Sequence, residues 1–236
     1  MTPPNTRIFI IAEGQSEESF INAVIKPAFE TNQIYIIPIR MDTSKGYKGG
    51  DITFDRFQFN ALNKIKEDRN CFITTMFDFY GLGKGFPIQE TANINSIYQK
   101  AEYIENYMHS ELQKFAKNNG FEFRPERFIP YIQLHELEGL FFSDIEKLCS
   151  TEPNWHKFIP QLQKIRNDFE TPEHINNSFD TKPSRRLENI LSPVYSKKTN
   201  VRLAPIIGKK ITLETIEKEC LHFHQWLEKL RNLPKL

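Results

Sequence analysis

Five acidic residues lie at or shortly after the ends of apolar runs of the sequence, at positions where their carboxylates can be brought together. Glu13 ends the first such run, Asp78 ends a later one, and Glu136 and Glu138 come directly after another. Glu17 comes four residues after Glu13, in the first turn of an expected helix, so it can face the same side. Ligands of open α/β sheets bind at the carboxyl ends of the strands, so we expect these carboxylates to meet at one sheet edge.

A cluster of carboxylates is costly unless positive charge compensates it, because neighbouring negative charges repel one another. Oxygen ligands favour Mg²⁺ or Mn²⁺ over zinc, and Mg²⁺ typically takes one or two carboxylates together with water and substrate phosphates. The acids therefore predict a site for Mg²⁺ or Mn²⁺. The alternative is that each acid is an ordinary residue of a strand end or a first helical turn.

Positive charge is concentrated in one part of a nearly neutral chain. The protein has a formal net charge of +1, whereas residues 182–210 contain eight basic residues and one acid. Lys182, Arg185, Arg186 and Lys197 are the candidates for binding phosphate or nucleic acid, since the forked guanidinium of arginine suits phosphate oxygens. The segment indicates a phosphate-rich partner such as DNA or RNA, or else a solvated loop.

The expected elements place these residues on an α/β framework. Apolar runs of strand length alternate with segments of helical spacing, which implies a mainly parallel sheet covered by helices. Pro130 places the last strand at an edge or at a bulge. A polar, glycine-containing stretch at residues 42–51 is expected to be a loop. Strands are expected at residues 7–12, 34–39, 71–77 and 127–134, and helices at residues 16–29, 54–68, 95–117 and 136–148.

Residues 1–150 are therefore predicted to form one α/β domain. The following residues, 151–236, differ, because four prolines interrupt the stretch between Thr171 and Gly208. We predict them to be a mostly helical and loop extension that packs on the domain. Its helices are expected at residues 155–169, 184–191 and 212–230.

Composition excludes several classes of protein. The chain has 236 residues, of which 39% are hydrophobic and 26% charged, values typical of a globular protein. It contains no apolar run of about 18 residues that would predict a membrane span, and its first residues do not resemble a signal peptide. Three widely spaced cysteines argue against a disulfide framework. We expect a cytoplasmic protein without a membrane partner.

Seven short motifs occur in order along nearly the whole chain. They are Glu13-Gly14-x-Ser16-Glu17, Phe77-Asp78-Phe79-Tyr80-Gly81, His135-Glu136-x-Glu138, Pro172-Glu173-x-Ile175-Asn176, Pro183-Ser184-Arg185-Arg186-Leu187, Tyr195-x-Lys197 and Cys220-x-His222-Phe223-x-x-Trp226-Leu227. Each motif alone is weak, whereas their order and spacing together are specific. Together they resemble a bacterial Toprim-like family, the domain-of-unknown-function family 4276.

This resemblance implies a Rossmann-like Toprim fold with a glutamate after the first strand and an Asp-x-Asp pair after a later one. Glu13 and Asp78 match that pattern, but Tyr80 stands in place of the second aspartate. Either Glu136 or Glu138 replaces that ligand, or the metal site is weakened or lost. The resemblance also implies a relation to overcoming-lysogenisation-defect nucleases, a partner ATPase of the AAA or ABC type and a role in anti-phage defence.

The favoured hypothesis is a metal-dependent nuclease, which hydrolyses phosphodiester bonds. Asp78, with Glu136 or Glu138, would be a direct or water-mediated ligand of Mg²⁺, and Glu17 a second ligand or an outer-sphere acceptor. Glu13 would be a ligand or a general acid/base, as the resemblance implies. Two alternatives stay open: a Toprim module that binds nucleic acid or a partner ATPase without cutting, and a phosphohydrolase of small nucleotides. An oligomer is compatible with the sequence.

Two further patterns are weaker. The segment from Gly81 to Gly85 lacks the spacing of a Walker A motif, and we predict a mobile loop over the acidic cleft. Cys220, His222 and His224 are soft metal ligands by type, yet only Cys220 and His224 share a face of a helix. Ordinary positions of a closing helix are therefore the preferred interpretation. His135 either carries a proton or orients a carboxylate.

Overall fold

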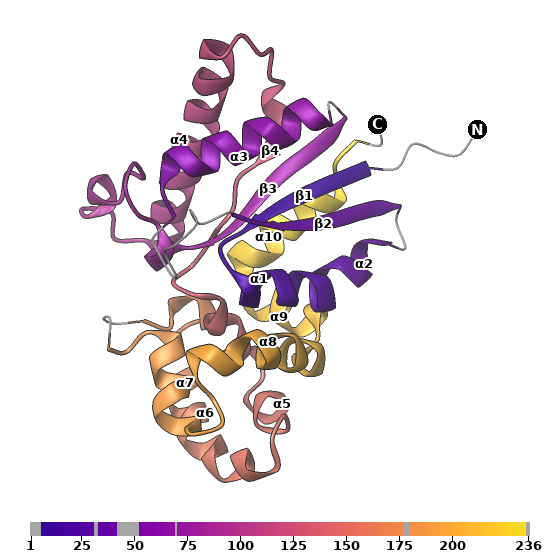
Figure 1. Cartoon of the computed structure of the whole chain (residues 1–236). Helices are drawn as coiled ribbons and strands as arrows, with labels where there is room; N and C mark the ends of the chain where they lie inside the picture. Colours follow the sequence, from indigo (N-terminus) through magenta and orange to yellow (C-terminus); the bar gives the residue numbers. More distant parts are fainter. Residues whose placement is uncertain (1–5, 31–32, 42–51, 69, 177–179, 235–236) are drawn as a thin grey trace.

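The computed structural model describes residues 6–30, 33–41, 52–68, 70–176 and 180–234, so the loop expected at residues 42–51 lies outside the described residues. The fold is α/β, with a parallel sheet flanked by helices (Figure 1). The strand order is β2-β1-β3-β4, and β5 also pairs with β3. The strands are β1 (Thr6–Ala12), β2 (Ile34–Arg40), β3 (Cys71–Asp78), β4 (Phe128–Ile129) and β5 (Ile132–Gln133).

Helices connect and cover the strands. The α-helices are α1 (Gln15–Phe20), α2 (Lys26–Glu30), α3 (Phe54–Glu67), α4 (Ile97–Asn118), α5 (Ile145–Cys149), α6 (Ile159–Asn167), α7 (Pro183–Leu191), α8 (Lys197–Ile211), α9 (Leu213–Glu219) and α10 (Leu221–Arg231). A π-helical turn (Ile21–Ile25) joins α1 to α2. The 3₁₀ turns include Phe79–Gly81, Gln89–Thr91, Pro125–Arg127, Leu137–Ser143, Pro153–Phe158 and Pro172–His174.

The two faces of the sheet are buried by different helices. On one face Ile11, Ile73 and Phe77 pack in a core cluster with apolar residues of α3 and α4. On the other face Ile8 and Ile10 belong to a cluster that includes residues of α1, α8 and α10. Because β1 and β3 are covered on both sides, they read as continuous apolar runs, which is why their positions are predictable from the sequence.

The predicted fourth strand consists of two short pieces, β4 and β5, separated at Pro130 and Tyr131. Proline has no N–H group for a strand ladder, and the segment lies at an edge of the sheet, as Pro130 predicted. The side chain of Thr75 fills the gap in the ladder. Its hydroxyl donates to the carbonyl of Tyr131 at 2.8 Å and accepts from the Tyr131 N–H at 3.0 Å.

The helix predicted at residues 136–148 is wrong. A 3₁₀ turn, Leu137–Ser143, and the short helix α5 take its place. The backbone N–H of Leu137 is taken by Asp78, and Asp144 caps a new start by accepting the Lys147 N–H at 2.8 Å. Both contacts involve side chains whose effect on the backbone does not show in the apolar spacing.

The helix α8 corrects a second prediction, since residues 171–208 were expected to contain one short helix. Ser196 and Thr199 form a capping box at its start, and the helix continues through Pro205. Gly208 lets the helix lie close to α1, because a Cβ there would come within 2.6 Å of the Phe20 ring. The closing helix predicted at residues 212–230 is divided at Cys220 into α9 and α10.

Residues of the C-terminal part complete the core beneath the sheet. Helix α10 lies on one side of the sheet in Figure 1, and its Trp226 indole donates to the hydroxyl of Thr74 in β3 at 2.8 Å. The ring of Tyr131 stacks on Trp226 with 4.2 Å between the ring centroids. The sheet of the N-terminal part and the helices of the extension therefore share one core cluster.

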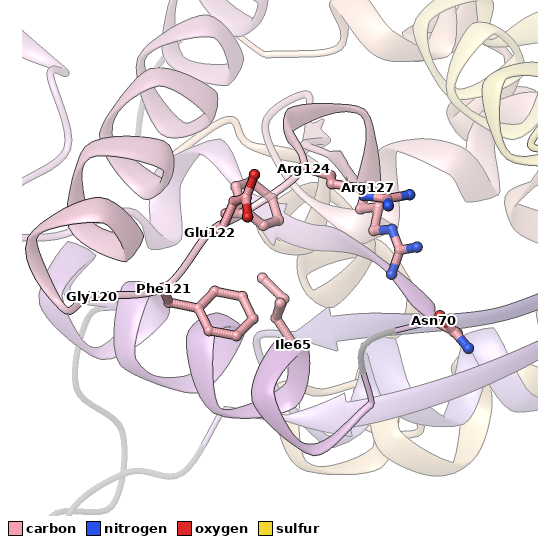
Figure 2. A pocket seen from close by; sticks show the side chains of 8 residues that line it. Ile65, Asn70, Gly120, Phe121, Glu122, Arg124 and Arg127 are labelled. Atoms are coloured by element: carbon pink, nitrogen blue, oxygen red, sulfur yellow. The ribbon is translucent and has the colours of Figure 1, made fainter.

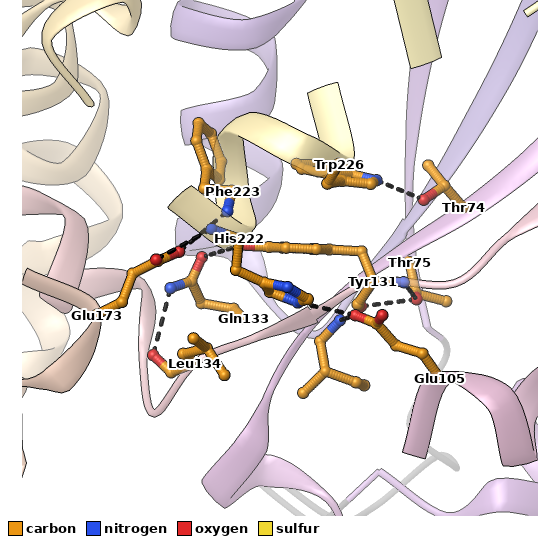
Figure 3. Close-up of polar contacts among 11 residues, drawn as sticks. Thr74, Thr75, Glu105, Tyr131, Gln133, Leu134, Glu173, His222, Phe223 and Trp226 are labelled. Atoms are coloured by element: carbon orange, nitrogen blue, oxygen red, sulfur yellow. Dashed lines mark hydrogen bonds and ion pairs between the residues drawn. The ribbon is translucent and has the colours of Figure 1, made fainter. Parts of the chain in front are cut away.

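Two buried glutamates fix the N-terminus of α10 (Figure 3). Glu173, 1% exposed, accepts the backbone N–H groups of His222 and Phe223 at 3.0 and 2.9 Å, and the Tyr98 hydroxyl at 3.2 Å. Glu105 accepts the Ile132 N–H and contacts the His222 ring, both at 2.9 Å. Free N–H groups at a helix start favour a carboxylate there, so the pair ties α10 to α4 and β5.

Within the described residues, none of the helices has both the length and the apolar character that crossing a membrane requires.

Candidate functional site

The carboxyl ends of β1 and β3 bring Glu13 and Asp78 together. The two strands are parallel neighbours in which Ala12 pairs with Met76, so the chain leaves both strands at the same edge. The backbone N–H of Asp78 donates to Oε2 of Glu13 at 3.3 Å. The expectation that these two acids meet at the sheet edge is confirmed in this geometry.

Asp78 in turn contacts the segment that carries the other two strand-end acids. Its Oδ1 accepts the backbone N–H of Leu137 at 3.0 Å. Leu137 lies between Glu136 and Glu138, which are 7% and 8% exposed. Three segments far apart in the sequence therefore converge on one largely buried group of acids, which we call the acidic cluster: Glu13, Glu17, Asp78, Glu136 and Glu138.

Glu17 completes the cluster from the first turn of α1. It is 7% exposed, and its carboxylate faces back toward the turn, where a Cβ on Gly14 would lie 3.1 Å from its Oε2. Its charge raises the pKa values of both Glu13 and Asp78. The predicted placement of Glu17 on the side of Glu13 is therefore found.

Glu136 is held by two positive or donating groups. Its Oε1 forms an ion pair with the Lys182 ammonium at 2.6 Å, and its Oε2 accepts the Ser184 N–H at 2.9 Å. Ser184 lies in the first turn of α7, where backbone N–H groups favour negative charge. Both oxygens of Glu136 are thus engaged in positioning α7 against the cluster.

Glu138 is held by neutral hydrogen-bond donors. Its Oε1 accepts the side-chain amide of Asn200 at 2.9 Å and the Tyr195 hydroxyl at 3.4 Å. The Tyr195 hydroxyl also lies 3.1 Å from Oδ1 of Asn200. These neutral donors orient the carboxylate without cancelling its charge.

Burial and mutual repulsion make the cluster hard to ionise. Burial, followed by the charge of Glu17, raises the pKa of Glu13 to about 7. Burial, followed by the charge of Glu136, raises the pKa of Glu138 to about 8. Burial also raises the pKa values of Glu17 and Asp78. A cation bound among these oxygens would remove the repulsion that contributes to the shifts.

The donor set fits Mg²⁺ or Mn²⁺ with few direct protein ligands. In the described part of the chain, the acids of the cluster do not place three ligand atoms within 4.8 Å of one another, whereas Glu217, His224 and Glu228 do. Arg231 already pairs with Glu217 at 2.5 Å and with Glu228 at 2.8 Å, so its guanidinium supplies the positive charge for these acids. Mg²⁺ usually takes only one or two carboxylates and several waters, so a site of this kind does not require three ligand atoms of the protein close together.

Two of the four basic candidates lie at the cluster. Lys182 pairs with Glu136, and Lys197, exposed at the start of α8, lowers the pKa values of Glu13 and Glu17 through its charge. The other two have contacts within the C-terminal part. Arg185 pairs with Glu188 at 2.8 Å, and Arg186 donates to the carbonyl of Thr181 and lies 5.3 Å from the centre of the Phe169 ring.

Tyr80 and His135 lie together at the edge of the cluster. Their rings stack with 5.6 Å between centroids, and His135 has a left-handed backbone, with φ of 64°. Burial, with a smaller effect of His174, lowers the pKa of His135 to about 4, so its imidazole is neutral at neutral pH. Tyr80, which occupies the position of the second aspartate of the resemblance, is 46% exposed, and its hydroxyl accepts the side-chain amide of Asn176.

Residue-type reasoning missed the groups that hold the carboxylates. Asn200 and Ser184 act on Glu138 and Glu136, and neither belongs to a residue type that suggests metal chemistry. Gly81 was assigned to a loop over the cleft, but its direct contact with Glu13 was not predicted. An added Cβ at Gly81 would lie 2.1 Å from Oε2 of Glu13. The sequence feature that could have indicated this contact is a glycine three residues after Asp78.

We expect Gly81→Ala to damage the acidic cluster without unfolding the protein. The methyl group would push the Glu13 carboxylate away from the Asp78 N–H, and the carboxylate is the flexible end of a side chain. Mn²⁺ affinity, measured by calorimetry, should fall about tenfold, as for other losses of ligand orientation. Gly139→Ala is the control, since its Cβ would meet atoms only at 3.5 Å or more. Equal Mn²⁺ affinities of the two variants would contradict this role of Gly81.

Comparison with protein-family models matches residues 12–231, nearly the whole chain, to one family, described as a domain of unknown function (DUF4276). Comparisons with curated proteins and with solved structures find no match.

Proposed function

Because this chain belongs to the DUF4276 family, whose description assigns no activity, we propose from the site itself that it is a metal-dependent nuclease. The observation that carries the proposal is the convergence of five carboxylates from three separate segments at the carboxyl edge of the sheet. Lys182 and Lys197 are the basic residues that act on them. A buried site with this excess of negative charge is best stabilised by a divalent cation.

We assign different roles to the five acids. Glu13 and Asp78, which are adjacent, would hold the cation directly, and Glu17 and Glu138 would hold its waters. Glu136 positions Lys182 and the start of α7, since both of its oxygens are engaged. When bound, the divalent cation supplies positive charge for the phosphate oxygens and makes a coordinated water more acidic.

Lys197 is the group best placed to meet the substrate phosphate. It is exposed, it lies near the start of α8, and its charge reaches Glu13 and Glu17. A phosphodiester that approaches the cluster would bring negative charge, which Lys197 can neutralise. Arg185, exposed on α7, would extend the basic surface along a longer nucleic acid.

The resemblance to Toprim-like proteins supports the choice of DNA or RNA as substrate and of an AAA- or ABC-type ATPase as partner. On the same ground we propose that the nuclease is the effector of an anti-phage defence system. The chain's own residues support a phosphate-binding site, and the choice of partner rests on the resemblance.

One observation favours a second candidate function, a module that binds nucleic acid or its partner without cutting. Tyr80 stands where the Toprim pattern has a second aspartate, and the nearby Glu136 is engaged by Lys182 and Ser184. If no replacement ligand completes the site, phosphate binding by the lysines would remain while hydrolysis is lost.

The test is cleavage of plasmid DNA, single-stranded DNA and RNA by the purified full chain with Mg²⁺ or Mn²⁺, with and without the ATPase encoded nearest to it. We expect cleavage that a chelator abolishes. Asp78→Ala and Glu13→Ala should each lower the rate at least about a hundredfold, the usual scale for loss of one acid–base or ligand group. Glu146→Ala, which removes an exposed acid of α5, should keep the wild-type rate.

Each alternative has its own result in this assay. Salt-dependent binding of nucleic acid without cleavage in Mn²⁺ would establish the binding module in place of the nuclease. Hydrolysis of a nucleotide while polymers stay intact would establish the small-nucleotide phosphohydrolase. Full activity of Asp78→Ala and Glu13→Ala would show that the acidic cluster does not perform the chemistry.

A further inference from the structure

A pocket (Figure 2) lies at the end of β3 opposite to the acidic cluster. It has a volume of about 430 Å³, within the range that small-molecule sites usually have. Asn70, just before β3, lines it, whereas Asp78 ends the strand. Eight residues of strand separate the two places, roughly 25 Å at the usual rise per residue. The pocket is therefore distinct from the acidic cluster.

Arg127 is the unusual residue of this pocket. Its side chain lines the cavity and the residue is 8% exposed, yet its guanidinium makes no hydrogen bond or ion pair with the described residues. A buried, unpaired charge is costly, and buried arginines are normally paired with an anion. An anion bound in the pocket would supply such a partner.

A short turn places a second arginine on the same side. Arg124 precedes the 3₁₀ turn Pro125–Arg127, and the Arg127 N–H donates to the Arg124 carbonyl at 3.0 Å. Both arginines line the pocket, Arg127 as a buried residue and Arg124 as an exposed one (Figure 2). Two forked guanidinium groups match the several oxygens of a phosphate better than the single charge of a carboxylate.

The remaining walls suit a ring attached to that phosphate. The Phe121 ring and the Ile65 side chain lie beside each other below the arginines in Figure 2. The Asn70 amide, also on the pocket wall, offers both a donor and an acceptor. We propose that this pocket binds a nucleotide, with its phosphate on Arg124 and Arg127 and its base against Phe121 and Ile65.

One acid opposes this ligand. Glu122 also lines the pocket, but it is exposed, so water screens its charge from a bound phosphate. Removing the charge of Glu122 should change the affinity for a nucleotide in the opposite direction to removing an arginine. Affinity for a nucleotide should rise about twofold to threefold in Glu122→Gln, the scale of an exposed charge interaction.

The test is calorimetric titration of the full chain with adenosine 5′-monophosphate, adenosine and inorganic phosphate, in the presence of a chelator. We expect the monophosphate to bind at least tenfold more tightly than either of the other two. Arg127→Met and Arg124→Met should each weaken its binding at least tenfold. The melting temperature of Arg127→Met should equal or exceed that of the wild type, because the variant removes an unpaired buried charge.

Two matched variants locate the ligand. Arg202→Gln removes a surface arginine, 60% exposed, and should leave binding unchanged, as should Asp78→Ala in the acidic cluster. Tighter binding of a 5′-phosphorylated than of a 5′-hydroxyl oligonucleotide would identify a strand end as the source of the phosphate, and binding of the free nucleotide alone would identify a metabolite. Equal affinities for adenosine and its monophosphate, or unchanged binding in Arg127→Met, would overturn the proposal.

Discussion

Without divalent cations, the protein should become less stable as the pH rises from about 5 to 8. The pKa values of Glu13 and Glu138 are raised to about 7 and about 8, and an unfolded chain has values near 4.5. Between these limits the folded state binds more protons than the unfolded state, so its stability falls as the pH rises. The loss should amount to several kcal/mol, since one pKa unit corresponds to about 1.4 kcal/mol.

Divalent cations should reverse this trend. Because Mg²⁺ or Mn²⁺ and protons compete for the same carboxylates, the melting temperature should rise more on addition of metal at about pH 8 than at about pH 5.5. Thermal unfolding at several pH values, with and without metal, measures both effects. Glu138→Gln should flatten the pH dependence, and the exposed Glu146→Gln should not. If the stability of the metal-free protein is constant or increases over this pH range, the pKa values of the acidic cluster are not raised as described.

Glu173→Ala should strongly destabilise the folded protein. It removes the acceptor of two helix N–H groups of α10 and of the Tyr98 hydroxyl, all in a site that is 1% exposed. Leaving several buried donors without an acceptor costs about 3–5 kcal/mol, and the melting temperature, measured by thermal unfolding, should fall by roughly 6–20 °C.

Glu170→Ala is the matched control for this prediction. Glu170 lies three residues earlier in the same segment, its side chain is 83% exposed, and its contact with His174 is long, at 3.9 Å. We expect less than about 0.5 kcal/mol from its removal. Glu173→Gln should give an intermediate result, because the amide keeps one acceptor oxygen. A Glu173→Ala variant as stable as the control would mean that the capping contacts contribute little.

The strands and helices that bury side chains at a regular spacing could be predicted from the sequence. The strands β1, β2 and β3 and the helices α3 and α4 begin and end within a few residues of the expected ranges. The turn Leu137–Ser143 and the helix α8 were not predicted, because tertiary contacts decide them. Asp78 takes the Leu137 N–H, and Gly208 permits close packing on Phe20, and neither effect shows in periodicity.

The acidic site was predictable in its members and not in its organisation. Parallel topology alone implies that Glu13 and Asp78 come together, because neighbouring strands end at one edge. The pairing of Glu136 with Lys182, and the hold of Asn200 on Glu138, depend on how α7 and α8 pack. That packing joins residues far apart in the sequence, in a region interrupted by prolines, where spacing carries little information.

The contact between Thr74 and Trp226 has a consequence for synthesis on the ribosome. The two partners are 152 positions apart in sequence, so the nascent β1–β3 layer emerges long before the helix that seals its lower face. During that interval, the core cluster that contains Ile8 and Ile10 lacks the residues of α10, and the nascent chain is vulnerable to aggregation. A fragment truncated before α10 would keep this defect permanently, so expression trials should use the chain through Arg231.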